Sequence, residues 1–197
     1  MSISLVKGQK IDLTKNNKSL KQLLIGLGWS PADTNRKGFF KKTSSIDLDS
    51  SVFMLRGDKL VNNRDIIYFG NLKSTCGGVI HKGDNLTGTG NGNDDEQILV
   101  DLDKIPQDVN KLVFVINIYS CNIRKQDFGM IKNAFIRIVN NTDKNELLNF
   151  NLTEGYSGKT AMIIGEVYRH DKEWKFAAIG EGTNDISIDS LACKYRG

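Results

Sequence analysis

The segment GDNLTGTGNGNDDE, residues 83 to 96, places four acidic side chains among four glycines. Carboxylate and carbonyl oxygens are hard ligands that suit Ca²⁺ or Mg²⁺, whereas zinc and copper prefer the His and Cys that this segment lacks. Glycines let backbone carbonyls turn inward, which favours the irregular coordination of Ca²⁺ over the octahedral coordination of Mg²⁺. The segment therefore predicts a calcium site, with acidic candidates at Asp84, Asp94, Asp95 and Glu96.

Other functions of this segment are less well supported by its residues. Phosphate-binding loops of the GxxxxGK[ST] or GxGxxG type are absent, and the carboxylates would repel an unaided anion. An EF-hand loop counted from Asp84 would place Leu86 and Gly88 at ligand positions, so that motif is excluded. A solvated acidic turn between two strands remains the alternative interpretation.

A second acidic pair lies in SSIDLDSSVFML, residues 44 to 55. Asp47 and Asp49 would point to the same face of a strand because side chains alternate along it. Two carboxylates about 4 Å apart repel by roughly 1 kcal/mol in water and about 4 kcal/mol at an effective dielectric constant near 20. A cation would offset that repulsion, so both residues are candidate ligands; the alternative is a wet outer face.

The elements that would position these residues are mostly strands, since the apolar runs are short, β-branched and bounded by Gly, Asn or Asp. Helical periodicity appears near the C-terminus, at Ile188, Leu191, Ala192 and Tyr195, and a short helix near 126 to 132 is also expected. The predicted fold is all-β, an antiparallel β-sandwich with few short helices. The expected strands are 3 to 6, 22 to 27, 51 to 55, 65 to 69, 78 to 81, 97 to 102, 112 to 119, 134 to 139, 146 to 152, 160 to 168 and 173 to 179.

Length and composition predict one domain over residues 1–197, with 39% apolar residues to form a core. The basic residues are scattered and the net charge is only +4, so no nucleic-acid partner is expected. No apolar run approaches a membrane span and MSISLVKGQK lacks a signal-peptide core, so a cytoplasmic protein is expected. Three separated cysteines, Cys76, Cys121 and Cys193, are expected to be reduced.

Five segments resemble, in order and spacing, the tellurium-resistance TerD-like family over nearly the whole chain. They are GLGW (26–29), IDLDSSVF (46–53), GDNLTGTGNGNDDE (83–96), FGMIKNAFIRIVN (128–140) and GEVYRHDKEWKFAAIGEG (165–182). The resemblance implies a β-sandwich and a cytoplasmic bacterial stress protein. It also implies an acidic cluster that binds calcium, commonly as a pair of ions. The family has no established molecular activity.

The resemblance also extends the ligand set. The family's GDN motif matches residues 83–85 and adds Asn85 as a candidate ligand. The family's pair of asparagines corresponds here to Gly70 and Asn71, so only Asn71 is a candidate. Where the family usually has GDGD, this chain has asparagines at positions 91 and 93. Asn keeps a carbonyl ligand but removes a charge, which predicts weaker binding than in an all-Asp relative. The implied metal candidates are Asp47, Asp49, Asn71, Asp84, Asn85, Asn91, Asn93, Asp94, Asp95 and Glu96.

The resulting expectation is a calcium-binding, non-enzymatic protein of a tellurite or general stress resistance system, holding one or two Ca²⁺ ions. It would act through assembly with other proteins of a stress-resistance complex and associate at most peripherally with a membrane. No positioned base or nucleophile accompanies the acidic cluster, which argues against a hydrolase. The alternative function is a small-ligand binder, of the cyclic-nucleotide type, that uses calcium.

Overall fold

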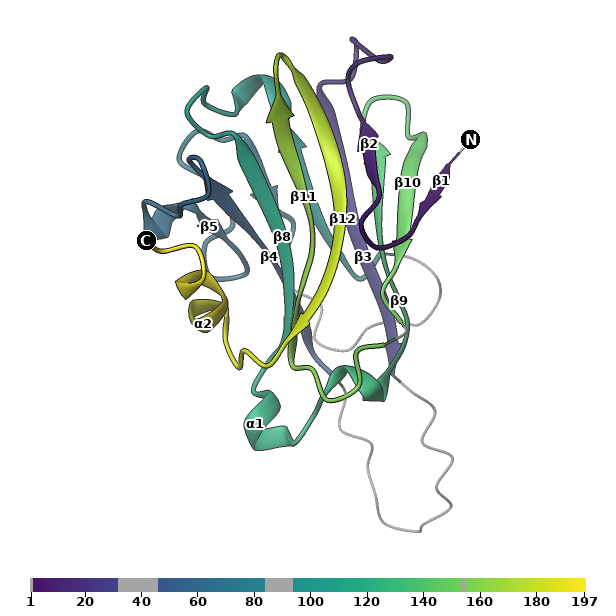
Figure 1. The fold of residues 1–197 in the computed structure, drawn as a ribbon, viewed down its shortest axis with the longest axis vertical. Coiled ribbons are helices and arrows are strands. Elements are labelled where there is room, and N and C mark those ends of the chain that lie inside the picture. Colours follow the sequence, from purple (N-terminus) through teal and green to yellow (C-terminus); the bar gives the residue numbers. More distant parts are fainter. Residues whose placement is uncertain (1, 32–45, 84–93, 154) are drawn as a thin grey trace.

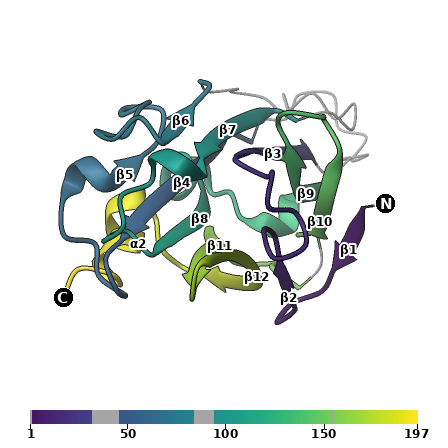
Figure 2. The ribbon, with the colours of Figure 1, turned by 90° about the horizontal axis from the view of Figure 1, so that it is seen from above.

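The computed structural model describes residues 2–31, 46–83, 94–153 and 155–197. Within these residues the chain forms two six-stranded sheets packed face to face, which confirms the predicted β-sandwich (Figure 1). Figure 2 shows the two layers from above. Four candidate ligands from the sequence lie outside the described residues: Asp84, Asn85, Asn91 and Asn93.

The first sheet is antiparallel except at one edge, where β1 runs parallel to β10. Its strands, in spatial order, are β1 (Ile3–Leu5), β10 (Glu146–Asn151), β9 (Ile131–Asn140), β3 (Gln22–Pro31), β7 (Glu96–Asp101) and β6 (Val79–His81).

The second sheet is antiparallel throughout. Its strands, in spatial order, are β2 (Lys10–Asp12), β12 (Glu173–Thr183), β11 (Ala161–His170), β8 (Lys111–Ile118), β4 (Leu48–Leu55) and β5 (Ile66–Ile67).

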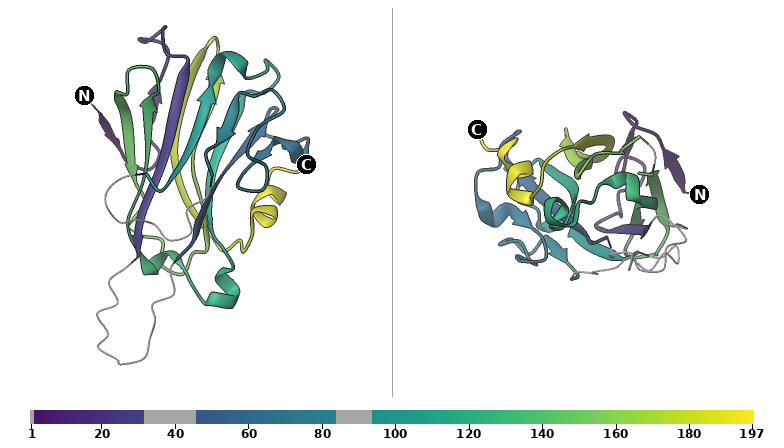
Figure 3. Two further views of the ribbon diagram at one scale, coloured as in Figure 1. Left: turned by 180° about the vertical axis from the view of Figure 1, so that it is seen from behind. Right: turned by 90° about the horizontal axis from the view of Figure 1, so that it is seen from below.

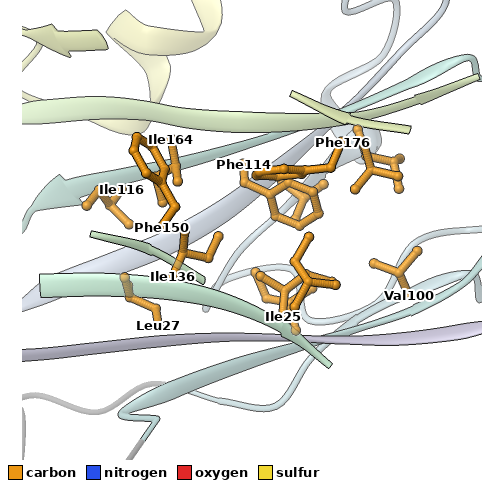
Figure 4. Packing of buried hydrophobic residues seen from close by; sticks show 14 of the residues in the cluster. Ile25, Leu27, Val100, Phe114, Ile116, Ile136, Phe150, Ile164 and Phe176 are labelled. Atoms are coloured by element: carbon orange, nitrogen blue, oxygen red, sulfur yellow. The ribbon is translucent and has the colours of Figure 1, made fainter. Parts of the chain in front are cut away.

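The main core fills the space between the sheets, as Figure 4 shows for Phe114, Phe150 and Phe176. Side chains that alternate along each strand supply this core, because one face of every strand meets the opposite sheet. In β4, Leu48 and Val52 point into it. Phe53 instead joins a second apolar cluster on the outer side of the second sheet.

Helices are few and short in the described part of the chain: α1 (Cys121–Arg124), α2 (Ile188–Cys193) and three 3₁₀ turns. Helix α2 begins at a capping box, in which Ser187 accepts from the Ser190 N–H and Ser190 reaches back to Ser187. The predicted C-terminal helix is therefore confirmed. The expected short helix near 126 to 132 is present only as one 3₁₀ turn, Phe128–Met130, because α1 ends at Arg124.

The segments NTDKNE (141–146) and RHDKEW (169–174) contain the turns that join β9 to β10 and β11 to β12. Lys144 and Asp171 adopt positive φ angles of 61° and 59° there, as tight turns require. The chain ends lie on opposite sides of the molecule, with α2 beside the C-terminus (Figure 3).

Candidate metal centre

Glu96 is the first residue of β7 and connects the two sheets at one end of the sandwich. Its Oε2 accepts a 2.7 Å hydrogen bond from the backbone N–H of Ser50 in β4. Because β7 and β4 belong to different sheets, this contact depends on the packing of the layers. The side chain of Glu96 is only 1% exposed, so its carboxylate is held almost entirely away from water.

Asp47 lies immediately before β4 and is likewise buried. Its backbone carbonyl accepts from the Tyr119 N–H at 2.9 Å, and its Oδ2 is 3.6 Å from Nη1 of Arg124 in α1. Burial raises the pKa of Asp47, Arg124 opposes that shift, and the negative charge of Glu96 raises the pKa further. The two carboxylates are therefore close enough to repel each other. Helix α1 is visible at the end of the sandwich where β8 terminates (Figure 1).

One oxygen of each of these two carboxylates has no hydrogen-bond partner in the described part of the chain: Oδ1 of Asp47 and Oε1 of Glu96. Buried polar atoms are nearly always paired, and a buried, unpaired carboxylate is especially costly. A divalent cation would satisfy both oxygens and remove the repulsion between the two charges. The donor set therefore fits a hard cation.

His81, at the end of β6, supports the Glu96 side of this cluster. Its Nδ1 accepts from the Gly83 N–H at 3.1 Å, which leaves the proton of the neutral ring on Nε2. That atom lies 3.1 Å from Ser50 Oγ and 3.6 Å from Glu96 Oε2. His81 is thus a buried neighbour of the candidate ligands and contacts Ser50 and Glu96.

Asp94 forms a structural ion pair in the described residues. Arg137 donates to its Oδ1 from Nε at 2.7 Å and to its Oδ2 from Nη2 at 3.0 Å, and Gln97 donates to Oδ2 at 3.0 Å. Gly26 lies between Arg137 and Gln97 in the sheet register, and a Cβ added to it would clash with the Asp94 carboxylate. Only glycine leaves space for the Asp94 carboxylate over this strand.

The remaining described candidates also have protein partners. Oδ2 of Asp95 accepts from the Trp29 N–H at 2.9 Å. Oδ2 of Asp49 accepts from Nδ2 of Asn117 at 3.4 Å. Nδ2 of Asn71 donates to the Ile66 carbonyl at 2.7 Å and closes the turn after β5.

Among the described residues, no three His, Cys, Asp or Glu side chains form a group that could hold a metal. Asp47 and Glu96 are therefore the described part of the candidate centre. The sequence names both residues as candidates but gives no indication of Ser50 and Arg124. Neither has a sequence signal, because both reach the cluster through contacts between elements distant in the chain.

Two further features concern the cysteines and the helices. Cys76, Cys121 and Cys193 are unpaired, as the sequence predicts. No helix in the described residues is long and apolar enough to cross a membrane.

Comparison with known proteins shows which proteins this chain is similar to in sequence. Stress response protein SCP2 of Bacillus subtilis (strain 168) is 54% identical over 200 residues, which cover 99% of this chain and 100% of that protein. Tellurium resistance protein TerD of Serratia marcescens is 44% identical over 183 residues, 92% of this chain and 91% of that protein.

The fold has a counterpart among solved structures. A homologue of telluride resistance protein (TerD) from Streptomyces coelicolor A3(2) aligns with a TM-score of 0.65 at 19% identity. The alignment covers 86% of this chain and 94% of that one. The TerD domain model itself matches residues 1–195, and the chain therefore belongs to the TerD domain family.

Proposed function

We propose that this chain is a calcium-binding, non-enzymatic protein of a stress-resistance system that includes resistance to tellurite. The stress and tellurite part is supported by the names of relatives at 44% and 54% identity, which are a tellurium resistance protein and a stress response protein. The general stress protein 16U of Bacillus subtilis (strain 168), at 48% identity, gives the same support.

The calcium part is carried by one observation: two buried, mutually repelling carboxylates each leave an oxygen without a partner in the described residues. Asp47 and Glu96 would hold the ion. Asp84, Asn85, Asn91 and Asn93, which lie outside the described residues, are the proposed remaining ligands. Bound calcium would supply positive charge and fix the relative position of the chain segments that bind it.

A structural role for the ion follows from where Asp47 and Glu96 lie. They belong to segments that enter different sheets, so one ion bound by both would hold the two layers together at this end. We propose that the surface ordered in this way serves assembly with other proteins of a resistance complex in the cytoplasm. At most a peripheral association with a membrane is proposed.

Thermal unfolding with and without calcium tests the proposal. Calcium that binds only the folded chain should stabilise it by RT ln(1 + [L]/Kd), about 2.7 kcal/mol at a free concentration of roughly 100 times Kd. Asp47→Asn should lose most of the calcium-dependent rise in Tm. Without calcium it should be about as stable as the parent, because removing the charge relieves the cost of burying it and the repulsion with Glu96, which offsets the lost attraction to Arg124.

The matched control is Asp171→Asn, in an exposed turn at positive φ that asparagine tolerates. It should keep the full calcium-dependent rise. An Asp47→Asn protein that keeps the same rise as the parent would exclude Asp47 as a ligand.

A further inference from the structure

A separate pocket of about 270 Å³ lies on the outer side of the second sheet, against β4, β8 and the beginning of α2. Its polar lining includes Asp49, Ser51 and Asn117 together with Ser120 and Ser187, and its aromatic lining is Tyr68, Phe69 and Tyr119. Ligand pockets commonly have this composition, with apolar walls and a few placed polar groups. The volume is slightly below the range for drug-sized ligands, which indicates a small ligand or a single side chain.

Two buried polar atoms on this lining have no hydrogen-bond partner in the described part of the chain: Oγ of Ser51 and Oδ1 of Asn117. These residues are only 1% and 6% exposed. Nδ2 of Asn117 donates to Asp49 Oδ2 at 3.4 Å, across the β4–β8 pair in which these residues are register partners. This bond uses the amide nitrogen and leaves the amide oxygen as a buried acceptor with no partner in the described residues.

The aromatic side chains form a connected set at the mouth of the pocket. The rings of Tyr68 and Phe69 meet edge to face with centroids 5.2 Å apart, and Phe69 and Tyr119 meet in the same way at 6.4 Å. Phe69 and Tyr119 are 42% and 45% exposed. Large aromatic side chains kept this exposed, next to unpaired buried acceptors, indicate a surface that a ligand covers.

The chemistry of the lining selects the ligand. Its amide oxygen and carboxylate are acceptors, and the hydroxyl of Ser51 can also accept, so the ligand should carry several N–H donors. A carboxylate beside aromatic rings favours a positive charge, which the ring faces attract. Arg124 already places its guanidinium 5.3 Å from the centroid of Tyr119, and its charge is directed to Asp47. A phosphate group would instead be repelled by Asp49.

We propose that this pocket binds an organic cation with N–H donors, that is, a guanidinium or primary ammonium group. The group would donate to Asn117 Oδ1 and Ser51 Oγ, lie beside the Asp49 carboxylate and be covered by Phe69 and Tyr119. This proposal goes beyond the calcium proposal and does not depend on it. The cation could come from a free amine or from an arginine or lysine side chain of a protein.

NMR titration in the presence of a calcium chelator tests the ligand class. Methylguanidinium and butylammonium should bind at the pocket at least about tenfold more tightly than tetramethylammonium, which lacks donors, and than methylurea, which lacks charge. An N-acetylarginine amide and a short arginine-containing peptide then distinguish the sources. Tighter binding of the peptide identifies a protein side chain, whereas equal binding shows that the pocket recognises the cationic group alone and identifies a free small cation. Binding of methylurea as tight as that of methylguanidinium overturns the proposal, as does the absence of binding by both cations.

Variants separate the pocket from general effects on folding. Phe69→Ala and Tyr119→Ala should each weaken binding of methylguanidinium at least about fivefold, since cation–π contacts and burial of the ligand are lost. Leu72→Ala is the matched control, because Leu72 is similarly exposed and is outside the pocket lining. Full binding in both aromatic variants would contradict the assignment.

Ser51→Ala distinguishes a ligand-binding role of the hydroxyl from a purely structural role, because the two roles predict different effects on Tm and on binding. Removing an unpaired buried hydroxyl should leave Tm unchanged or raise it, yet binding of methylguanidinium should weaken. If Ser51→Ala binds methylguanidinium as tightly as the parent, the Ser51 hydroxyl does not contact the ligand and that part of the proposal is wrong. Asp49 is left intact because it is also a candidate calcium ligand, and each variant should keep the calcium-dependent rise in Tm. A failure of the cation proposal is thereby distinguishable from a failure of the calcium proposal.

Discussion

Replacing Asp94 with alanine separates a structural role from a metal-binding role for that carboxylate. The side chain is 1% exposed and accepts three hydrogen bonds, two of them from Arg137. Breaking a fully buried ion pair costs about 3–5 kcal/mol. Arg137 is 33% exposed and retains Glu146 at 3.5 Å, so screening and the second partner reduce the expected loss to about 2–3 kcal/mol.

For a chain of this length such a loss lowers Tm by about 4 to 12 °C. Calcium-free thermal unfolding measures it, with Asp103→Ala as the control. Asp103 pairs with Lys21 at 2.7 Å at the surface, where both side chains are more than half exposed, so its loss should be under about 1 kcal/mol.

Gly26→Ala perturbs the same pair without replacing either of its members, since the new methyl group would displace the Asp94 carboxylate from above the strand. Alone, Gly26→Ala should destabilise the parent. Added to Asp94→Ala, it should cause almost no further loss of stability, because the carboxylate that it would clash with is absent. Calcium should raise the Tm of Asp94→Ala by about as much as that of the parent. If Asp94→Ala is as stable as the parent but loses the calcium-dependent rise, the reasoning is refuted and Asp94 is a ligand.

Three further predictions concern other parts of the chain. Burial raises the pKa of Tyr195 to about 12, so the folded state favours the neutral phenol; its contribution is complete below the unfolded pKa near 10 and is lost as pH rises towards 12. Tyr195→Phe should therefore lose less stability than the parent across that interval in denaturant titrations. Joint replacement of Cys76, Cys121 and Cys193 should leave calcium binding intact and cause no loss of tellurite resistance beyond any loss of folding, which a resistance assay on a folded variant checks. Ser187→Ala should destabilise the chain by about 1 kcal/mol in chemical unfolding, because the cap of α2 is lost.

The strands were predictable where apolar, β-branched residues follow one another over a long stretch, as in β8 and β11. Strand β2 was missed because its three residues, Lys10 to Asp12, are exposed or half-buried and carry no pattern. It forms only because Ile11 pairs with Phe176 of β12, a partner that is remote in the chain.

The candidate site was predictable where the residue type alone indicates a possible metal ligand. Asp47 and Glu96 stand out as acidic residues at the beginning of strands, and in the structure both are buried and the charge of Glu96 raises the pKa of Asp47. The position of Asp94 over Gly26 depends instead on the register of β3 with β7 and β9, which no local pattern specifies. The same holds for the pairing of Asn117 with Asp49 across β4 and β8.

Direct calorimetric titration of calcium into the parent chain and into Glu96→Gln tests the central claim. The parent should bind calcium at least about tenfold more tightly than magnesium, as oxygen ligands on a glycine-rich segment favour the larger ion. Glu96→Gln keeps an acceptor for the Ser50 N–H but lacks the second anionic oxygen, so its calcium affinity should fall at least about tenfold. No calcium binding by the parent, or equal affinity in Glu96→Gln, would contradict a calcium centre at Asp47 and Glu96.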